Sequence, residues 1–175
     1  MYELHEHEQY FFDLPTLSGL AEFVRRAGFS SPCCLCCPLV GQTFAAQKLP
    51  VHILDIDERF AATPGFARYD IYRPAWTGVS YDLIICDPPF FKVSLSQLFN
   101  AVRLLSRNDY NQPLLLCYLA RRGANVMGTF SRFGLRATGL RSGYRTVQQS
   151  ARNDIEFFSN LPDEALESLR EALGQ

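Results

Sequence analysis

The order of apolar and polar positions along the chain predicts a protein in which helices and strands alternate. Leu17, Leu20, Phe23 and Val24 recur at the three- and four-residue spacing of a helix, and Gly28 follows as a stop. Similar spacing recurs further along the chain. The predicted helices cover residues 14–27, about 41–48, 94–105, about 121–130 and 163–173.

Short apolar runs separate these helices and predict strands. The sequence YDLIIC at residues 81–86 is the clearest, because a nearly continuous apolar run is typical of a parallel strand buried on both faces. The other predicted strands cover residues 33–37, 51–56, 69–72, 113–118, 134–140 and 154–158. Strands that alternate with helices favour an α/β fold with a doubly wound, mostly parallel sheet. No repeat or linker divides the chain, so residues 1–175 are predicted to form one domain.

Composition narrows the class of protein. The chain has 175 residues and a net charge of −1, which argues against a strongly cationic nucleic-acid coat but leaves room for a local basic surface. Its 14 Phe and 8 Tyr argue against disorder. No apolar run approaches the roughly 20 residues of a membrane span, and the first residues lack a secretory pattern. A cytoplasmic protein is therefore expected.

Four of the six cysteines lie in the run SPCCLCCPLV. Two overlapping C-x-x-C spacings in this run are compatible with zinc or redox chemistry. However, adjacent residues of a strand point to opposite faces, and the three histidines do not supply a second paired set of ligands. Free cysteine behaves as a small apolar residue. We interpret the run as a buried strand and expect no metal, with a zinc site and a redox site as alternatives.

The sequence Asp87-Pro88-Pro89-Phe90 directly follows the predicted central strand, at the edge of the sheet where α/β proteins bind ligands. The prolines remove two N–H donors, so nearby carbonyl oxygens and the Asp87 carboxylate are left as acceptors. A planar amine held by these acceptors can turn its nitrogen lone pair toward an incoming methyl group. Phe90 and Phe91 offer a face for stacking a base. The alternative is a rigid turn without catalytic function.

Further candidates follow other strands at the same edge. Asp57, ahead of Asp55, is expected to accept hydrogen bonds from ribose hydroxyls, or else to cap a short helix. Asp70 is a candidate acceptor for the amine of a cofactor's adenine. Gly41, in a loop that has no glycine-rich motif, could let the backbone approach a ligand.

The sequence DPPF after a central strand is similar to the signature of amino-group methyltransferases. More narrowly, the chain resembles the probable N6-adenine methyltransferases, a family that also contains translation elongation factor lysine methyltransferases. The matching pieces span residues 2–160 and are YELHEHEQYFFD, CCPLVGQTF, LDIDERF, FARYDIYRP, YDLIICDPPFF and NDIEFFSN. The resemblance implies a Rossmann-like sheet of the class I methyltransferase type and S-adenosylmethionine as methyl donor.

By this resemblance, Asp87, Pro88, Pro89 and Phe90 form the catalytic motif, and Asp57 and Asp70 contact the cofactor. Cys37, Pro38 and Gly41 are the remaining candidates for its methionine end. Phe11 and Phe12 lie before Asp13, where the family has an aromatic pair before an acid. Residues 1–13 are expected either to close over the site as a lid or to support the first helix.

The acceptor amine is expected to be adenine N6 in a nucleic acid, RNA or DNA, with a protein lysine as the alternative. A lysine must first lose a proton from a group with a pKa of about 10.4. No acid occurs between Asp109 and Asp154, whereas this stretch contains seven arginines, among them Arg141 and Arg145. These arginines are candidates for phosphate contacts, for a solvated surface or for internal pairing with acids.

Two other classes of function compete with an active enzyme. A catalytically silent methyltransferase-like module would bind a nucleic acid or a protein without transferring a methyl group. A small zinc protein would use the cysteine run. The sequence does not fix the oligomeric state.

Overall fold

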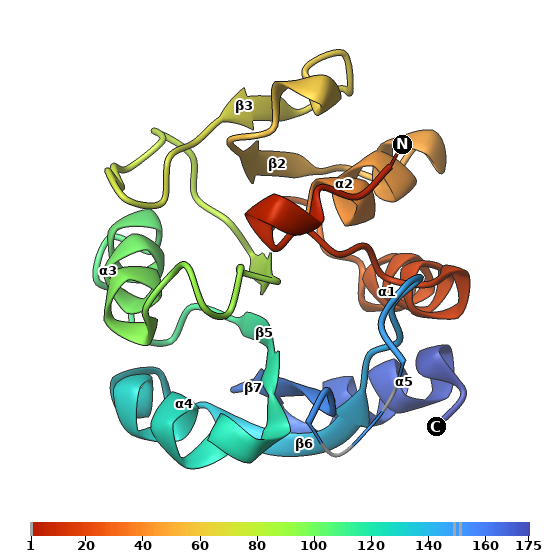
Figure 1. Cartoon of the computed structure of the whole chain (residues 1–175), viewed down its shortest axis with the longest axis vertical. Coiled ribbons are helices and arrows are strands. Elements are labelled where there is room, and N and C mark those ends of the chain that lie inside the picture. The colour runs from red at the N-terminus through yellow and green to blue at the C-terminus, as the bar shows by residue number, and fades with distance from the viewer. Residues whose placement is uncertain (1, 149, 151) are drawn as a thin grey trace.

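A computed structural model describes residues 2–148, 150 and 152–175 of the chain, and it contains one seven-stranded sheet in the order β3-β2-β1-β4-β5-β7-β6 (Figure 1). The strands are β1 (Pro32–Leu35), β2 (His52–Asp55), β3 (Phe66–Arg68), β4 (Leu83–Cys86), β5 (Leu114–Leu119), β6 (Arg136–Arg141) and β7 (Ile155–Ser159). The α-helices are α1 (Leu14–Ala27), α2 (Pro38–Ala46), α3 (Leu95–Leu105), α4 (Gly123–Thr129) and α5 (Asp163–Leu173). Short 3-10 helices are η1 (His5–His7), η2 (Glu58–Phe60), η3 (Ala120–Arg122) and η4 (Ser131–Phe133).

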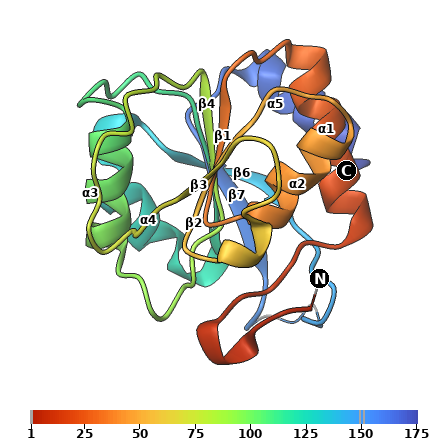
Figure 2. The same ribbon diagram turned by 90° about the horizontal axis from the view of Figure 1, so that it is seen from above.

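The sheet is mixed and covered on both faces. Strands β3, β2, β1, β4 and β5 pair in parallel, while β7 is antiparallel to both β5 and β6. Helices α1, α2 and α5 lie on one face, and α3 and α4 lie on the other (Figure 2). The predicted doubly wound, mostly parallel α/β sheet is therefore confirmed.

The strand order reverses between β1 and β4, which are neighbours in the sheet although β2 and β3 lie between them in the sequence. Leu35 at the end of β1 pairs with Cys86 at the end of β4. Loops that leave such a pair of strands diverge to opposite faces of the sheet, and ligands bind in the crevice between them. This topology places a site next to the residues that follow Leu35 and Cys86.

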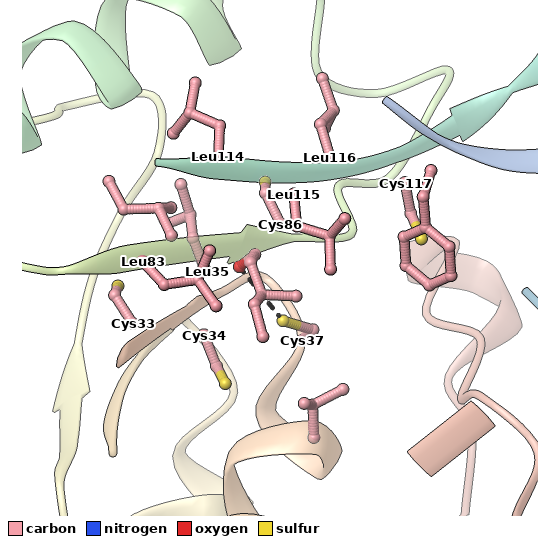
Figure 3. Packing of buried hydrophobic residues seen from close by; sticks show 14 of the residues in the cluster. Cys33, Cys34, Leu35, Cys37, Leu83, Cys86, Leu114, Leu115, Leu116 and Cys117 are labelled. Carbon is pink, nitrogen blue, oxygen red and sulfur yellow. Dashed lines mark hydrogen bonds between the residues drawn. The ribbon is translucent and has the colours of Figure 1, made fainter. Parts of the chain in front are cut away.

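The cysteine run lies in the core, but only its first half forms the strand (Figure 3). Cys33 and Cys34 lie in β1 with no exposed surface, and both are free thiols. Cys36 adopts a left-handed backbone with φ 58°, and Cys37 is the residue before α2, so the strand ends earlier than expected. Within the described ranges, no three His, Cys, Asp or Glu residues are grouped as a metal site.

Helix α2 begins at Pro38, three residues before the predicted start at Gly41. Proline ends a strand because it lacks an N–H donor, but the same property suits it to the first turn of a helix. Pro38 therefore both follows β1 and starts α2. The loop between strand and helix is correspondingly short, which brings the start of α2 close to the end of β1.

The third strand lies at Phe66–Arg68 and not at residues 69–72 as predicted. The chain turns at Asp70, whose Oδ1 accepts the N–H of Tyr72 at 2.9 Å, while the Arg73 N–H donates to the Asp70 carbonyl at 2.9 Å. An aspartate that binds the backbone two residues ahead favours a turn over a strand. Asp70 consequently follows β3 at the sheet edge instead of lying inside the strand.

The remaining predicted elements occur with small shifts at their ends. Helix α1 has the predicted bounds, because the Asp13 carboxylate accepts the Thr16 N–H at its start and Gly28 is left-handed at its end. In the part of the chain that the structure describes, every helix is too short or too polar to cross a bilayer.

Candidate active site

A cavity of about 670 Å³ opens at the carboxyl ends of β1, β2 and β4. This volume lies in the range of about 300–1,000 Å³ that is typical of small-molecule and cofactor sites. Its lining comes from six segments that are far apart in the sequence. They are residues 4 and 8–12, 36–40, 55–58, 68–72, 87–93 and 144.

The sequence Asp87-Pro88-Pro89-Phe90, here called the DPPF corner, forms part of the cavity wall and is held by contacts with β1 and β5. Asp87 directly follows β4, and its N–H donates to the Leu35 carbonyl at 3.3 Å. The Phe90 ring packs edge-to-face on Tyr118 at 5.0 Å between centroids, and the Tyr118 hydroxyl donates to the Phe90 carbonyl at 3.2 Å. The corner therefore faces a cleft with a fixed shape and is not packed away in the core.

The Asp87 carboxyl group lies in surroundings with little solvent. Burial raises the pKa of Asp87 to about 8, against the effect of one hydrogen bond from the Tyr144 hydroxyl at 2.7 Å, which lowers it. The side chain keeps partial access to the cavity. A carboxyl group at a cavity wall that ionises near neutral pH is characteristic of functional sites.

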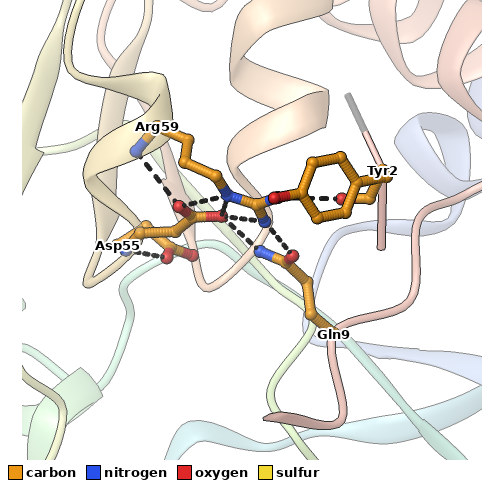
Figure 4. Close-up of polar contacts among 5 residues, drawn as sticks. Tyr2, Gln9, Asp55 and Arg59 are labelled. Atoms are coloured by element: carbon orange, nitrogen blue, oxygen red, sulfur yellow. Dashed lines mark hydrogen bonds and ion pairs between the residues drawn. The ribbon is translucent and has the colours of Figure 1, made fainter. Parts of the chain in front are cut away.

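Asp55 at the end of β2 and Asp57 just beyond it also line the cavity. Figure 4 shows the polar contacts around Asp55, Arg59 and Gln9. Asp55 is buried, and burial is the main cause that raises its pKa to about 6. Its Oδ1 accepts the Asp57 N–H at 2.8 Å. Asp57 behaves in the opposite way. Burial alone would raise its pKa, but hydrogen bonds from Arg59 and Gln9 outweigh that effect and lower it.

The guanidinium of Arg59 links Asp57 to the start of the chain. It forms an ion pair with Asp57 at 2.6 Å, donates to the Gln9 side chain at 2.6 Å and to the Tyr2 carbonyl at 3.0 Å, and lies 4.8 Å from the centre of the Tyr2 ring. Gln9 in turn donates to Asp57 at 2.8 Å. Asp57 also accepts the Arg59 N–H at the start of η2, so the predicted helix cap is present.

The N-terminal segment, residues 2–12, contributes Leu4 and residues 8–12 to the wall of the cavity. Besides its contact with Asp57, it reaches the DPPF side, where the Glu8 carboxylate accepts the N–H groups of Phe91 and Lys92 at 3.1 Å each. On a third side, Phe12 forms a backbone bridge with Tyr144. Phe11 and Phe12 are buried and line the cavity. The lid role of this segment stays a prediction, beside the alternative that Phe11 and Phe12 support the approach to α1.

Asp70, Cys37, Pro38 and Phe91, candidate ligand contacts by sequence, also line the cavity. Cys37 is buried, and its thiol donates to the Ile85 carbonyl at 3.5 Å. Phe91 is 70% exposed, which leaves its ring free at the cavity mouth.

Gly41, Arg141 and Arg145 were expected at the site, but the structure does not place them in the cavity wall. A side chain at position 41 would begin 2.3 Å from Cγ1 of Ile53, so Gly41 is required for α2 to pack closely on β2. This packing contact accounts for a glycine at position 41, and the predicted ligand contact of Gly41 stays a prediction.

The arginine-rich stretch is paired internally at several positions. Arg141 forms ion pairs with Asp154 at 2.7 Å and Glu156 at 3.1 Å, and Arg136 pairs with Asp163. The guanidinium of Arg145 lies 5.8 Å from the centre of the Phe11 ring. Internal pairing, the third of the alternatives considered for this stretch, therefore describes Arg136 and Arg141.

Sequence reasoning did not single out several cavity residues. Gln9, Tyr10 and Tyr72 line the cavity and lie in pieces of the family resemblance, but were not named as site residues, and Tyr144 lies outside those pieces. The indication that could have identified Tyr144 was its type and place. It is a tyrosine beside a glycine in a loop, and a buried tyrosine hydroxyl needs a hydrogen-bond partner.

Solved structures with a similar fold are methyltransferases. One is a TehB-like S-adenosylmethionine-dependent methyltransferase from Corynebacterium glutamicum, with 15% identity and a TM-score of 0.56 over 86% of this chain and 89% of that chain. Another is magnesium protoporphyrin IX methyltransferase from Synechocystis PCC 6803 with bound S-adenosylmethionine. It has 16% identity and a TM-score of 0.52 over 83% of this chain and 78% of that chain. At such identities the likeness concerns the fold, which is the class I methyltransferase fold.

Comparison with curated proteins returned no match. A family model described as "Probable N6-adenine methyltransferase" matches residues 3–161, nearly the whole chain. The matched range includes every residue of the cavity wall. Fold and family agree with the expected cofactor, S-adenosylmethionine. The chain belongs to the probable N6-adenine methyltransferase family.

Proposed function

We propose that this protein is an S-adenosylmethionine-dependent methyltransferase that acts on an amino group. The observation that carries the proposal is the convergence of two kinds of residue on one cavity of about 670 Å³. The DPPF corner supplies acceptors for an amine, and the acids after β2 supply acceptors for ribose hydroxyls. The family match supports the same class of reaction.

The cofactor would lie along the β1–β2–β3 side of the cavity. Asp57, whose N–H donates to Asp55, would accept hydrogen bonds from the ribose hydroxyls. Asp70 would accept a hydrogen bond from the adenine amine of the cofactor. Cys37 and Pro38 at the start of α2 would flank the methionine end. When bound, S-adenosylmethionine would supply a methyl group that the acceptor nitrogen takes with its lone pair. The sulfur would keep the electrons of the broken bond, and the methylated nitrogen would then release one N–H proton to solvent.

The DPPF corner would orient the acceptor amine. The Asp87 carboxylate and a carbonyl oxygen of the corner accept its N–H groups, which directs the nitrogen lone pair away from them and toward the cofactor. Phe90 is held in place by Tyr118, and Phe91 is exposed beside it. These two rings form a surface on which a planar base can stack.

Adenine N6 in a nucleic acid is our first choice of acceptor. Its amine is neutral, so it needs orientation and not the loss of a proton before transfer. Tyr10 and Tyr72 add further exposed rings to the cavity wall. Because the target base must leave its stack to enter such a cavity, single-stranded or structured RNA is favoured over duplex DNA.

Protein lysine is a second candidate, and a specific feature favours it. Glu8 and Glu58 line the cavity in addition to Asp55, Asp57 and Asp70, so its wall is rich in acids that attract a cation. However, a lysine must reach the site in its neutral form, and an ionised Asp87 would oppose the loss of its proton.

The test begins with calorimetric titration of the purified protein with S-adenosylmethionine. We then expect the protein to transfer labelled methyl groups to one of three separated fractions of the source cell: RNA, DNA or protein. Label recovered as N6-methyladenine would support our first choice, and label recovered as methyllysine would select the second. Cofactor binding without transfer would favour a silent binding module. A protein that does not bind the cofactor would overturn the proposal.

We further propose a cytoplasmic location, where the cofactor and all three classes of acceptor are present. A nucleic acid or a protein substrate would be the partner in either case.

A further inference from the structure

Tyr144 lies in the loop between β6 and β7, 57 residues beyond Asp87 in the sequence. Its ring is buried, and its hydroxyl donates to Asp87 Oδ1 at 2.7 Å. Across residues 2–148, 150 and 152–175, no other hydrogen bond reaches the Asp87 carboxylate. The second carboxylate oxygen, Oδ2, is therefore the one left for a ligand.

The N-terminal segment holds the Tyr144 loop against the cavity. The Arg145 N–H donates to the Phe11 carbonyl at 2.9 Å, and the Asp13 N–H donates to the Gly143 carbonyl at 2.9 Å. The rings of Phe12 and Tyr144 lie 4.9 Å apart. Hydrogen bonds on both sides of Tyr144 and a ring contact thus fix the position of its hydroxyl.

Gly143 makes this close approach geometrically feasible. A Cβ atom at position 143 would lie 2.0 Å from Oδ2 of Asp13, the residue that caps α1. The absence of a side chain therefore lets the loop come close enough for the Tyr144 hydroxyl to reach Asp87.

The other titratable groups that face Asp87 stay neutral. They are the thiols of Cys37 before α2, Cys86 at the end of β4 and Cys117 in β5, and burial raises the pKa of each well above its usual value. Burial likewise raises the pKa of Tyr144. The hydroxyl of Tyr144 is consequently the one neighbour among these that stabilises an ionised Asp87.

We propose that Tyr144 is a positioning residue that fixes the Asp87 carboxylate, occupies Oδ1 and leaves Oδ2 to accept the N–H of the substrate amine. The proposal rests on the proposed function, since it assigns Asp87 to the acceptor amine. It adds Tyr144, from the β6–β7 loop, to the residues that act on the acceptor amine. It also implies that the position of the Asp87 carboxylate depends on the contacts between the N-terminal segment and this loop.

The direct test is a pH titration of the ligand-free protein by NMR, with aspartate labelled at the ¹³C carboxyl position and the Asp87 signal assigned from the D87N variant. The wild-type midpoint is expected near the pKa of about 8 that burial gives Asp87. In Tyr144→Phe, the ring contact with Phe12 remains and the donor is lost. The midpoint is expected to rise by about one pH unit, because the carboxylate loses its hydrogen bond.

Tyr81→Phe is the matched control. Tyr81 is also a buried tyrosine with one side-chain hydrogen bond, to Thr77 at 2.6 Å, but it lies before β4 at the other end of the strand. The Asp87 midpoint should not move in this variant. An unchanged or lower midpoint in Tyr144→Phe, or an equal rise in Tyr81→Phe, would overturn the proposal. Should Tyr144→Phe not fold, Phe12→Leu keeps the hydroxyl but loosens it, and a smaller rise is expected.

A second readout uses the pH profile of kcat/KM with the acceptor fraction that the wild-type protein methylates. Tyr144→Phe should lose about tenfold at pH 7 and recover toward the wild-type value at high pH, as one pKa unit corresponds to tenfold. A loss that is the same at every pH would indicate a merely structural role and contradict the proposal. If the wild-type protein methylates none of the fractions, the proposed function fails, whereas the NMR titration still decides the role of Tyr144.

Discussion

Asp57 and Asp87 occupy comparable positions, each in the loop that follows a parallel strand and each in the wall of the same cavity. Their surroundings differ. Asp57 accepts hydrogen bonds from Arg59 and Gln9, which lower its pKa, whereas burial raises the pKa of Asp87 to about 8 and only the Tyr144 hydroxyl opposes this.

The difference teaches how one edge of a sheet can provide two kinds of carboxyl group. An acid with a cation beside it stays charged at every physiological pH, so it can always accept hydrogen bonds from ribose hydroxyls. An acid enclosed by neutral thiols and rings can change its protonation near neutral pH. Environment, and not residue type or strand position, separates the proposed role in cofactor binding from the proposed role in transfer.

The largest effect is expected for Asp87→Asn. The substitution keeps the shape of the side chain but removes the carboxylate that would orient the amine, so kcat should fall by about 100-fold or more. Turnover is measured with the acceptor fraction identified for the wild-type protein. Asp109→Asn, in an exposed turn outside the cavity, is the control and should retain full turnover. Wild-type turnover by Asp87→Asn would remove Asp87 from the reaction.

Asp57→Asn should act on binding instead. The variant loses a charged acceptor and leaves the Arg59 guanidinium without its ion-pair partner, so Kd for S-adenosylmethionine should rise about tenfold, a change of about 1.4 kcal/mol. Calorimetry measures this value directly. Asp163→Asn breaks an aspartate–arginine pair at α5 and should leave Kd unchanged. Equal affinities of wild type and Asp57→Asn would contradict the assignment of the ribose contact.

The two acids should also differ in how they link stability to pH. An acid whose pKa is raised in the folded state keeps its proton there while the unfolded chain has lost it, so the free energy of unfolding falls as pH rises between the two pKa values. For Asp87 this window runs from about 4 to about 8, and for Asp55 it ends near 6. Asp57, with a lowered pKa, acts only at acidic pH, where its stabilising contribution is lost.

Between pH 6 and pH 8 the slope should therefore come from Asp87, at most about 1.4 kcal/mol per pH unit. Urea unfolding of wild type and Asp87→Asn over this range measures the slope. Asp87→Asn should have the flatter profile and Asp57→Asn the wild-type one. Parallel profiles for wild type and Asp87→Asn would show that Asp87 is ionised normally in the folded protein.

The smallest effect is expected for Gln9→Ala. Gln9 donates one hydrogen bond to Asp57 and accepts one from Arg59. The ion pair between Asp57 and Arg59 remains when Gln9 is removed, so the loss is partial. A loss of this size should raise KM for S-adenosylmethionine about threefold and leave kcat unchanged. A fall in kcat with constant KM would instead place the N-terminal segment on the acceptor side of the cavity.

The fold was predictable from sequence wherever apolar spacing was strong. Leu17, Leu20 and Phe23 define α1 correctly, and the apolar run before Asp87 defines β4. The shift of β3 arose because its residues are mostly exposed and because Asp70 prefers a turn. A local pattern cannot show an edge strand whose side chains meet solvent on both faces.

The position of a residue in the cavity wall was predictable where the residue closely follows a strand, as Asp87 and Asp57 do. Tyr144 was not, because its hydroxyl reaches Asp87 only after the β6–β7 loop pairs with Phe12, more than 100 residues earlier in the chain. The packing contact of Gly41 was not predictable for a related reason. Glycine serves both ligand approach and helix packing, and only the position of Ile53 distinguishes the two.

The most direct test of the division between the two acids is the rate of methyl transfer as a function of S-adenosylmethionine concentration, measured for Asp57→Asn and Asp87→Asn side by side. We predict that Asp57→Asn reaches the wild-type rate at saturating cofactor, while Asp87→Asn stays about 100-fold slower at every concentration. Recovery of Asp87→Asn at high cofactor concentration, together with a permanently slow Asp57→Asn, would contradict the account.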